Sequence, residues 1–456
     1  MLIRRHVATF AVLSFLMCST AFADVRLPHL IGNHMVLQRD MPIRIWGWAE
    51  PDEKVAVALN RQQATGTTNK DGKWEVTLPA MSAGGPYELL ITGKNQIKID
   101  DVLLGEVWIC SGQSNMNWVM SHRTTNFDQE IAAADHPQIR LFTVPEPKNA
   151  EARDDFQSEW YVCSSKTVGY FSAVAYYFGR ELNKELKVPV GLVVSAVPGT
   201  RIEPWTPGAG VELIAELKDK DKAEYSELYN SMIRPLTPLA IRGAIWYQGE
   251  GNVGDGFMYY HRMRALVGGW RKVWGQGDFP FYYVQLAPLN WGGKPKDQLP
   301  QIWEAQTAAL DIPNTGMVVT NDIGNTGDAH PRNKLDVGKR LANWALARTY
   351  GNKSVAYLSP LYESMRVDGN AIRVRFSNAA GGLASRNGKP LSWFTIAGAD
   401  QKFVPAEAKI DGDEVVVSSP EVTAPVAVRF GWHQIAEPNL MNKDGLPASS
   451  FRTDKW

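Results

Sequence analysis

The sequence predicts an α/β domain in the middle of the chain with a β-rich module on each side. Between residues 107 and 350, apolar strand-like runs alternate with amphipathic helical stretches, which is typical of a parallel sheet covered on both faces. On either side of this region, short β-prone runs are separated by turn residues. With 456 residues, the chain is long enough for several domains of ordinary size.

Residues 1–23 have the pattern of a secretory signal. Arg4 and Arg5 precede an apolar run, and Ala21-Phe22-Ala23 has the small-x-small pattern of a cleavage site. The run is shorter than the ~20 residues of a membrane-spanning helix. We therefore predict a mature chain that begins near Asp24, acts outside the cytoplasm (secreted or periplasmic) and has no membrane association once the signal is removed.

The charge balance argues against nucleic acid as a partner. The whole chain has 48 basic and 48 acidic residues, and loss of the signal leaves 46 basic and 48 acidic ones. Because no Lys/Arg cluster offsets this balance, we predict no polyanion-binding surface.

Two cysteines, Cys110 and Cys163, remain in the mature chain. They could form a disulfide in an oxidising compartment, or remain as buried thiols, and the sequence leaves both possibilities open. The chain has no C-x-x-C or H-E-x-x-H motif and no cluster of His and carboxylates at ligand spacing, so we predict no metal and no other cofactor.

The first β-rich module is predicted over residues 24–101. Short β-prone runs separated by turn residues suggest a small antiparallel sandwich. Trp46, Trp48 and Trp74 are expected in its core rather than on a sugar-binding platform. The predicted strands cover residues 35–38, 43–48, 55–59, 74–78 and 87–91.

The α/β domain is predicted over residues 102–350. Its first strand is the apolar run from Val107 to Cys110, which stops at Ser111 and Gly112. The predicted later strands are residues 190–196, 241–247, 280–286 and 316–320, and the predicted helices are residues 171–187, 258–273, 300–310 and 334–350.

The second β-rich module is predicted over residues 351–456. Asp-Gly and Asn-Gly turns separate its β-prone runs. The predicted strands are residues 372–376, 391–396, 414–417 and 426–430.

Small and reactive residues follow each predicted strand of the α/β domain. Each has an ordinary explanation as a turn or capping residue when taken alone. The carboxyl ends of parallel strands lie along one edge of a sheet, however, so these segments can converge, and together they favour a hydrolase site with Ser114 as nucleophile. The segments are Gln113-Ser114-Asn115, Pro198-Gly199-Thr200-Arg201, Gln248-Gly249-Glu250-Gly251-Asn252 and the stretch from Asn321 to Pro331.

Several motifs resemble those of the sialate O-acetylesterases, a branch of the SGNH (GDSL-like) hydrolases. They are W-I-C-S-G-Q-S-N-M from Trp108, W-Y-Q-G-E-G-N from Trp246 and H-P-R-N-K from His330, with N-H-M-V-L-Q-R from Asn33 and F-S-A-V from Phe171. The resemblance covers most of the mature chain. It implies a flavodoxin-like three-layer α/β domain with flanking β-sandwich modules.

The resemblance also implies roles for individual residues. Ser114 would be the nucleophile and His330 the general base. The backbone N–H groups of Ser114 and Gly199 and the side-chain amide of Gln248 would form the oxyanion hole, in which each donor is worth ~3 kcal/mol of barrier.

Four further residues are assigned to the surroundings of the site. Asn115, Glu250 and Asn252 are expected to support its loops rather than to contact substrate. Arg201 follows Gly199 closely and could bind the carboxylate of a sialic acid, or it could be a structural ion-pair partner.

The group that orients His330 departs from the SGNH pattern. These enzymes commonly carry an Asp three residues before the His, but here that position is Gly327 and the nearest acid is Asp328. The side chain of Asp328, its main-chain carbonyl or Asp322 could accept the imidazole N–H, and we expect the orientation to come from residue 328.

The sequence thus predicts a secreted, metal-independent carbohydrate esterase that removes O-acetyl groups from sugars, with O-acetylated sialic acid as first substrate. An acetylesterase on xylan-type hemicellulose is the enzymatic alternative, and a lipase-like hydrolase of long acyl esters is a second one. A sugar-binding protein with an inert central domain is the alternative of a different class.

Overall fold

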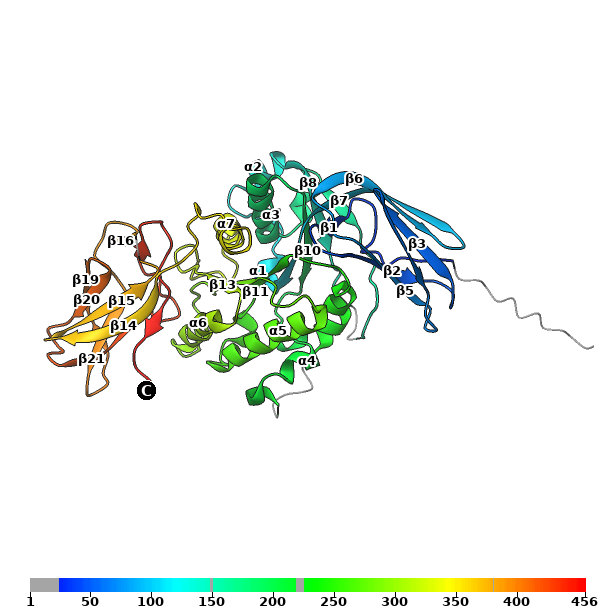
Figure 1. Ribbon diagram of the computed structural model, residues 1–456. Coiled ribbons are helices and arrows are strands. Elements are labelled where there is room, and N and C mark those ends of the chain that lie inside the picture. Colours follow the sequence, from blue (N-terminus) through cyan, green and yellow to red (C-terminus); the bar gives the residue numbers. More distant parts are fainter. Residues whose placement is uncertain (1–23, 148–150, 219–224, 380) are drawn as a thin grey trace, which may run out of the picture.

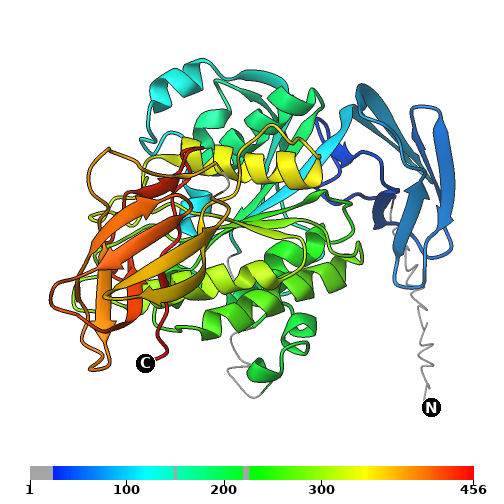
Figure 2. The ribbon, with the colours of Figure 1, turned by 60° about the vertical axis from the view of Figure 1, so that its left-hand side comes forward.

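The computed structural model describes residues 24–147, 151–218, 225–379 and 381–456. The predicted signal, residues 1–23, lies outside the described residues. The chain folds into a central α/β part that lies between an N-terminal and a C-terminal β-rich part (Figures 1 and 2). None of the described helices is long and apolar enough to cross a membrane.

The central sheet contains seven strands in the order β13-β12-β11-β7-β10-β8-β9. All neighbours are parallel except β9, which is antiparallel to β8 and forms one edge. The sheet is therefore mixed, and β8 and β9 were not predicted. The strands are β7 (Gln96–Gly112), β8 (Asp135–Thr143), β9 (Trp160–Ser164), β10 (Val190–Ala196), β11 (Gly243–Tyr247), β12 (Phe281–Val284) and β13 (Thr315–Val318).

Helices cover both faces of this sheet, as the sequence predicted. Helices α3 and α7 pack together on one face, while α5 and α6 pack together on the other (Figure 1). The α-helices are α1 (Ser114–Asn117), α2 (Phe127–Ala132), α3 (Ala173–Leu186), α4 (Gly208–Val211), α5 (Met258–Trp274), α6 (Gln298–Ala308) and α7 (Lys334–Trp344), and a π-helical turn over Ala345–Thr349 extends α7.

Strand β7 is the centre of the sheet. Its carboxyl-terminal half, from Val107 to Cys110, is fully buried because strands β10 and β11 pair with it on both sides. Gly112 at its end is in register with Ala196 of β10 and Tyr247 of β11. Three strands therefore end at the same level, and the loops that follow them begin side by side.

The N-terminal part is built mostly from antiparallel strands, with β1 parallel to β7, and it shares β7 with the central sheet. Strand β7 pairs with β6 at its beginning and enters the central sheet at its end, so the predicted boundary between residues 101 and 102 falls inside one continuous strand. The other strands are β1 (Val36–Gln38), β2 (Ile43–Trp48), β3 (Lys54–Leu59), β4 (Gln62–Thr67), β5 (Lys73–Leu78) and β6 (Gly84–Thr92).

The C-terminal part contains two four-stranded antiparallel sheets, β14-β15-β20-β19 and β18-β17-β21-β23, and the pair β16-β22. The two four-stranded sheets contribute to one apolar core. The strands are β14 (Leu361–Asp368), β15 (Ala371–Ser377), β16 (Leu383–Ser385), β17 (Phe394–Gly398), β18 (Val404–Pro405), β19 (Glu407–Asp411), β20 (Glu414–Ser418), β21 (Pro425–Phe430), β22 (Leu440–Asn442) and β23 (Phe451–Arg452). The domain boundaries and the sandwich topology of both flanking modules stay predictions.

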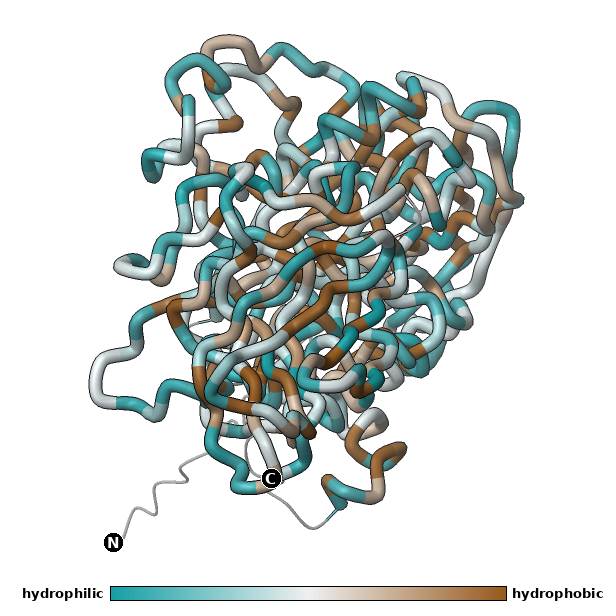
Figure 3. Tube along the Cα trace, turned by 90° about the vertical axis from the view of Figure 1, so that its left-hand side faces the viewer, coloured by the Kyte–Doolittle hydropathy of each residue, from teal (hydrophilic) through white to brown (hydrophobic). Residues whose placement is uncertain are grey.

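Apolar segments gather inside the molecule and polar segments at its periphery (Figure 3). Cys110 and Cys163 lie in this interior as free thiols. Burial raises the pKa of Cys163 to about 12 and holds that of Cys110 well above its usual value, so both thiols stay protonated and unreactive at neutral pH.

Candidate active site

A sharp turn connects β7 to the serine. Gly112 has φ +138°, and a Cβ at this position would lie 2.1 Å from the carbonyl oxygen of Tyr247, so only glycine fits. The N–H of Gln113 then donates to that same carbonyl, at 3.0 Å. Ser114 follows as the first residue of α1 and is half-buried. The turn therefore places the serine at the carboxyl end of the sheet, where its hydroxyl is accessible.

Ser114 and His330 form a hydrogen-bonded pair. The Nε2 atom of His330 lies 2.9 Å from Ser114 Oγ, although 216 positions separate the two residues in the sequence. His330 comes from the loop between β13 and α7, and its side chain is 30 % exposed. A serine within hydrogen-bond reach of an imidazole is the arrangement that activates a hydroxyl as a nucleophile.

The carboxylates near His330 have different environments. Asp328 Oδ1 lies 3.7 Å from His330 Nδ1 and accepts a hydrogen bond from the backbone N–H of His330 at 2.8 Å. Asp322 is excluded as the orienting group, because both of its oxygens accept hydrogen bonds from Arg340. Asp328 is thus the carboxylate that faces the histidine, at a distance longer than a hydrogen bond.

Trp118 packs against the histidine and was not predicted. Its ring stacks on the His330 ring with centroids 4.5 Å apart and an interplanar angle of 18°. The tryptophan lies just after α1, one helical turn beyond Ser114. This four-residue spacing is the feature of the sequence from which its place beside the active site could have been inferred. Burial lowers the pKa of His330, Lys334 lowers it further and Asp328 opposes both effects. The imidazole is therefore neutral at pH 7 and can accept a proton.

Gly199 lies in the loop after β10, which begins beside the serine turn, because the N–H of Val197 donates to the carbonyl oxygen of Gly112 at 3.2 Å. Gly199 has φ +73°, which favours glycine, and a Cβ there would meet nothing within 4 Å, so backbone conformation rather than space explains the residue. Among the described residues, the backbone N–H groups of Ser114 and Gly199 donate to no other group of the chain. Both are available to a bound ligand.

The side-chain amide of Gln248, predicted to be an oxyanion donor, is hydrogen-bonded to other residues of the chain. Gln248 is fully buried, and its side-chain nitrogen donates to Thr200 O at 3.1 Å and to Asn252 Oδ1 at 2.8 Å. Its side-chain oxygen accepts a hydrogen bond from the hydroxyl of Tyr259 at 2.9 Å. Both amide protons are used within the chain, so Gln248 connects two loops and is not a free oxyanion donor in this structure.

Asn115 and Glu250 connect the serine turn to the neighbouring loops by hydrogen bonds. The side-chain nitrogen of Asn115 donates to Glu250 and, at 2.9 Å, to the carbonyl oxygen of Ala329, next to His330. The side-chain oxygen of Asn115 accepts a hydrogen bond from Lys334, which is fully buried. Burial lowers the pKa of Lys334 to about 7 and raises the pKa of Glu250. Lys334 is the last residue of the H-P-R-N-K motif, and the sequence indicated no role for it.

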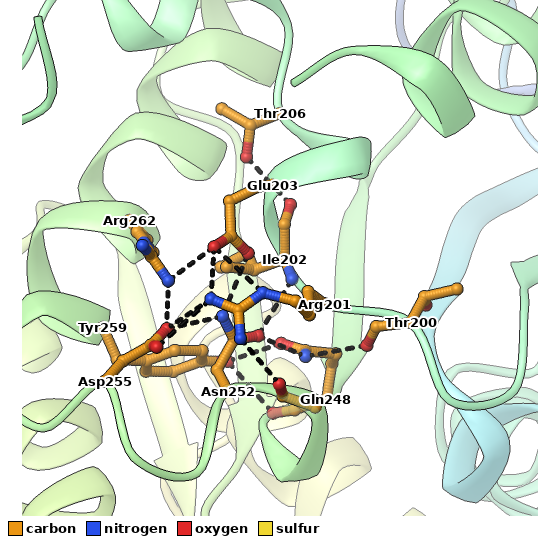
Figure 4. A network of polar contacts seen from close by, with 11 residues as sticks. Thr200, Arg201, Ile202, Glu203, Thr206, Gln248, Asn252, Asp255, Tyr259 and Arg262 are labelled. Carbon is orange, nitrogen blue, oxygen red and sulfur yellow. Dashed lines mark hydrogen bonds and ion pairs between the residues drawn. The ribbon is translucent and has the colours of Figure 1, made fainter. Parts of the chain in front are cut away.

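Arg201 belongs to a network of ion pairs that joins the loops after β10 and β11 (Figure 4). Its guanidinium group donates to Glu203 at 2.7 Å, to Asp255 at 3.1 Å and to the carbonyl oxygen of Gly251 at 3.1 Å. In this structure Arg201 is therefore a structural ion-pair partner, and its guanidinium group is not available to bind the carboxylate of a substrate.

Asn252 lies in the middle of the same network. Its side-chain nitrogen donates to Glu203 at 3.0 Å and to Asp255 at 2.7 Å, while its oxygen accepts from Gln248 and from the backbone N–H of Ile202. Arg262, which the sequence did not single out, pairs with the same two carboxylates. The network therefore connects the loop after β10, which carries Gly199, to the loop after β11, which carries Gln248.

The site therefore combines a serine, a neutral histidine and two unused backbone donors at one edge of the sheet. Such an arrangement can attack a carbonyl carbon and hold the oxyanion that forms. Within the described residues, no group of three or more His, Cys, Asp or Glu side chains is arranged to hold a metal ion.

Comparisons with known proteins agree with this chemistry. Residues 104–347 match the family model described as carbohydrate esterase, sialic acid-specific acetylesterase. Sialate O-acetylesterase from Homo sapiens is 31 % identical over 389 residues, which cover 75 % of this chain and 74 % of that protein. The Mus musculus enzyme is 31 % identical over 409 residues, covering 74 % of this chain and 75 % of that protein.

A solved structure is similar over nearly the whole chain. The crystal structure of a carbohydrate acetylesterase from Xanthomonas citri has 39 % sequence identity and a TM-score of 0.89, and the alignment covers 95 % of this chain and 100 % of that one. Fold, site and relatives together define a carboxylic ester hydrolase. The chain belongs to the sialic acid-specific acetylesterase family of carbohydrate esterases.

Proposed function

We propose that this enzyme removes O-acetyl groups from sugars by nucleophilic catalysis with Ser114 and His330. The single observation that carries the proposal is the 2.9 Å contact between Ser114 Oγ and His330 Nε2 at the carboxyl end of the sheet. Membership of a carbohydrate esterase family supports an acetyl ester of a sugar as the substrate class.

The first half-reaction forms an acetyl-enzyme. His330 Nε2 takes the proton of Ser114 as Oγ bonds to the acetyl carbonyl carbon, and the carbonyl oxygen becomes an oxyanion. The bond to the sugar oxygen then breaks, and that oxygen receives the proton from His330. In the second half-reaction a water replaces the sugar, the same proton transfers occur, and acetate leaves with Ser114 restored.

The oxyanion would be held by the backbone N–H groups of Ser114 and Gly199. Each donor of this kind contributes ~3 kcal/mol to lowering the barrier. Gln248 would join them only by exchanging one of its hydrogen bonds to Thr200 and Asn252 for the oxyanion. Its more direct role is to hold the loop that carries Gly199.

O-acetylated sialic acid is the first substrate we propose, because the descriptions of the family model and of the mammalian relatives name sialic acid esters as their substrates. A neutral acetylated polysaccharide such as xylan is the second. A specific observation favours the second substrate: the guanidinium group of Arg201, the proposed partner of a sialic acid carboxylate, is paired with Glu203 and Asp255.

The decisive test compares acetate release by the natural chain and by Ser114→Ala. Hydrolysis of an aryl acetate should fall by roughly 10⁴-fold or more in the variant, because the nucleophile is lost. A natural enzyme that releases no acetate, or a variant with unchanged turnover, would refute the mechanism. Acetylated sialosides and acetylated xylan fragments assayed side by side would then identify the sugar, and cleavage of octanoate as fast as acetate would favour a lipase-like enzyme.

We also propose that the mature enzyme acts outside the cytoplasm, in the periplasm or secreted. The support is the signal-like pattern of residues 1–23. Amino-terminal sequencing of the exported protein should find a first residue near Asp24, and an enzyme that stays in the cytoplasm at full length would contradict this proposal.

A further inference from the structure

A cleft separates the N-terminal part from the central domain, far from the serine. Its volume is about 490 Å³, within the ~300–1,000 Å³ typical of ligand sites. One wall is the β2–β5 pair, with Trp46, Trp48 and Lys73, and the other includes Asp154, Arg234 and Thr237. The second wall lies just before β11, at the amino ends of the parallel strands, whereas Ser114 lies at their carboxyl ends.

Trp46 and Trp48 of β2 line this cleft. Trp46 and Trp74 are buried in the core, as expected, whereas Trp48 is partly exposed, which corrects the expectation for that one residue. Side chains two apart on a strand share a face, so Arg44, Trp46 and Trp48 point to the same side. Arg44 donates to the carbonyl oxygen of Thr237, so this side faces the second wall. Trp48 is only partly buried, whereas Trp74, from the opposite face of the pair, is 3 % exposed.

The tryptophans are accompanied by charges that balance within the chain. On β5, Glu75 is paired with Trp46 and Lys73 with Trp48, so their side chains share the tryptophan face. Lys73 and Arg234 both pair with Asp154, at 2.9 and 2.8 Å. Among the residues that line the cleft, two cations and two carboxylates balance, while the indole rings offer apolar surface. Two further cations lie beside the cleft, and both have partners within the chain: Arg44 donates to Thr237 O and Arg26 packs over the Trp48 ring.

The ring of Trp48 is held in place. The guanidinium group of Arg26 lies 4.9 Å from its centroid, and Arg26 also forms a backbone bridge with Trp48.

We propose that this cleft binds a neutral segment of a glycan chain. A sugar ring has an apolar C–H face that packs on an indole and a rim of hydroxyls that pair with polar groups, which matches this mixture of tryptophans and balanced charges. This proposal rests on the proposed function, in which the substrate is a carbohydrate. Because the cleft lies at the opposite end of the sheet from Ser114, it anchors a polymer without contacting the ester that is cleaved.

Binding is measured with Ser114→Ala, so that residual acetyl esters on a probe are not hydrolysed during the measurement. The probes are deacetylated xylan, deacetylated glucomannan and polysialic acid, and the method is affinity electrophoresis followed by calorimetry. We expect at least one neutral polymer to bind. Two further substitutions in this background, Trp48→Ala and Thr67→Arg, should each weaken binding at least fivefold. Thr67 is exposed at the rim, so an arginine there fills the cleft without removing a tryptophan.

A matched control removes an aromatic ring elsewhere. Tyr170 is 82 % exposed and lies outside the cleft, so Tyr170→Ala should bind as the background does. Thermal unfolding midpoints close to the background show that the variants fold. No binding of either neutral polymer, or binding that Trp48→Ala and Thr67→Arg leave intact, would overturn the proposal, as would a preference for polysialic acid. Aryl acetate hydrolysis by the natural chain tests the catalytic proposal separately.

Discussion

The ammonium group of Lys334 donates a hydrogen bond to the side-chain oxygen of Asn115, the residue that follows Ser114. The other end of the same amide donates to Glu250 and to the carbonyl oxygen of Ala329. One amide therefore joins the serine turn, the loop after β11 and the loop that carries His330. The cation also lies 5.4 Å from the centroid of the Tyr247 ring, so it is held on a second side.

Replacing Lys334 by Met should move the pH profile of the enzyme. The Lys334 charge lowers the pKa of His330, and His330 must be neutral to accept the serine proton. Without the charge the pKa of His330 rises, so the acid limb of kcat/KM should move to higher pH. Loss of the hydrogen bond to Asn115 should also lower the plateau about tenfold, since an unpaired buried group costs about 1–3 kcal/mol.

Lys339→Met is the control for this variant, because Lys339 is an exposed lysine on the same helix. Its pH profile and plateau should match those of the natural enzyme. A Lys334→Met enzyme with an unmoved acid limb would show that the cation does not act on His330, even if its turnover falls.

Asp328→Asn should move the acid limb the other way. The Asp328 carboxylate raises the pKa of His330, so its removal lowers that pKa and extends activity to lower pH. We expect kcat to fall by only about tenfold, because the side chain is partly exposed, its oxygen lies 3.7 Å from Nδ1, and asparagine can still accept from the His330 N–H. A loss of ~10⁴-fold, as for a buried orienting aspartate, would instead establish a full triad.

Trp118 is expected to keep the imidazole of His330 in position. Stacked aromatic pairs contribute about 0.5–1.5 kcal/mol, so Trp118→Ala should lower kcat on an aryl acetate by roughly two- to tenfold. Trp118→Phe retains a ring and should recover most of the loss. Single-substrate kinetics at the plateau pH check this, and equal activities of the two variants would exclude stacking as the cause.

The sequence was informative about the central domain because strand and helix patterns are local. The predicted strand 190–196 matches β10, and the predicted helices 171–187 and 258–273 correspond to α3 and α5. Strand β8 and the edge strand β9 were missed, since β8 begins with Asp135, His136 and Pro137 and lacks an uninterrupted apolar run. Strand β7 was shortened because its first half alternates polar and apolar residues, and only tertiary pairing extends it.

That Ser114 and His330 lie close together could be predicted from the sequence, because the carboxyl ends of parallel strands lie at one edge of a sheet. Which of the predicted oxyanion donors have no partner within the chain could not be predicted from the sequence. Gln248 looks like a donor in the sequence, but its partners Thr200, Asn252 and Tyr259 are known only from the packing of three loops. Likewise Lys334 appears as an ordinary helix lysine until the fold buries it beneath the serine turn.

The role of Arg201 separates structural support from substrate recognition. Its guanidinium group pairs with Glu203, which is fully buried, and Arg262 pairs with the same carboxylate. Because one cation remains, Arg201→Met should lower the free energy of unfolding by about 1–3 kcal/mol, less than the loss of a sole buried partner. Denaturant titration measures this change. The kcat/KM values for an acetylated sialoside and a neutral acetylated sugar should then fall by the same factor, because the loop that carries Gly199 is loosened for both. A loss confined to the sialoside would instead establish Arg201 as its carboxylate binder.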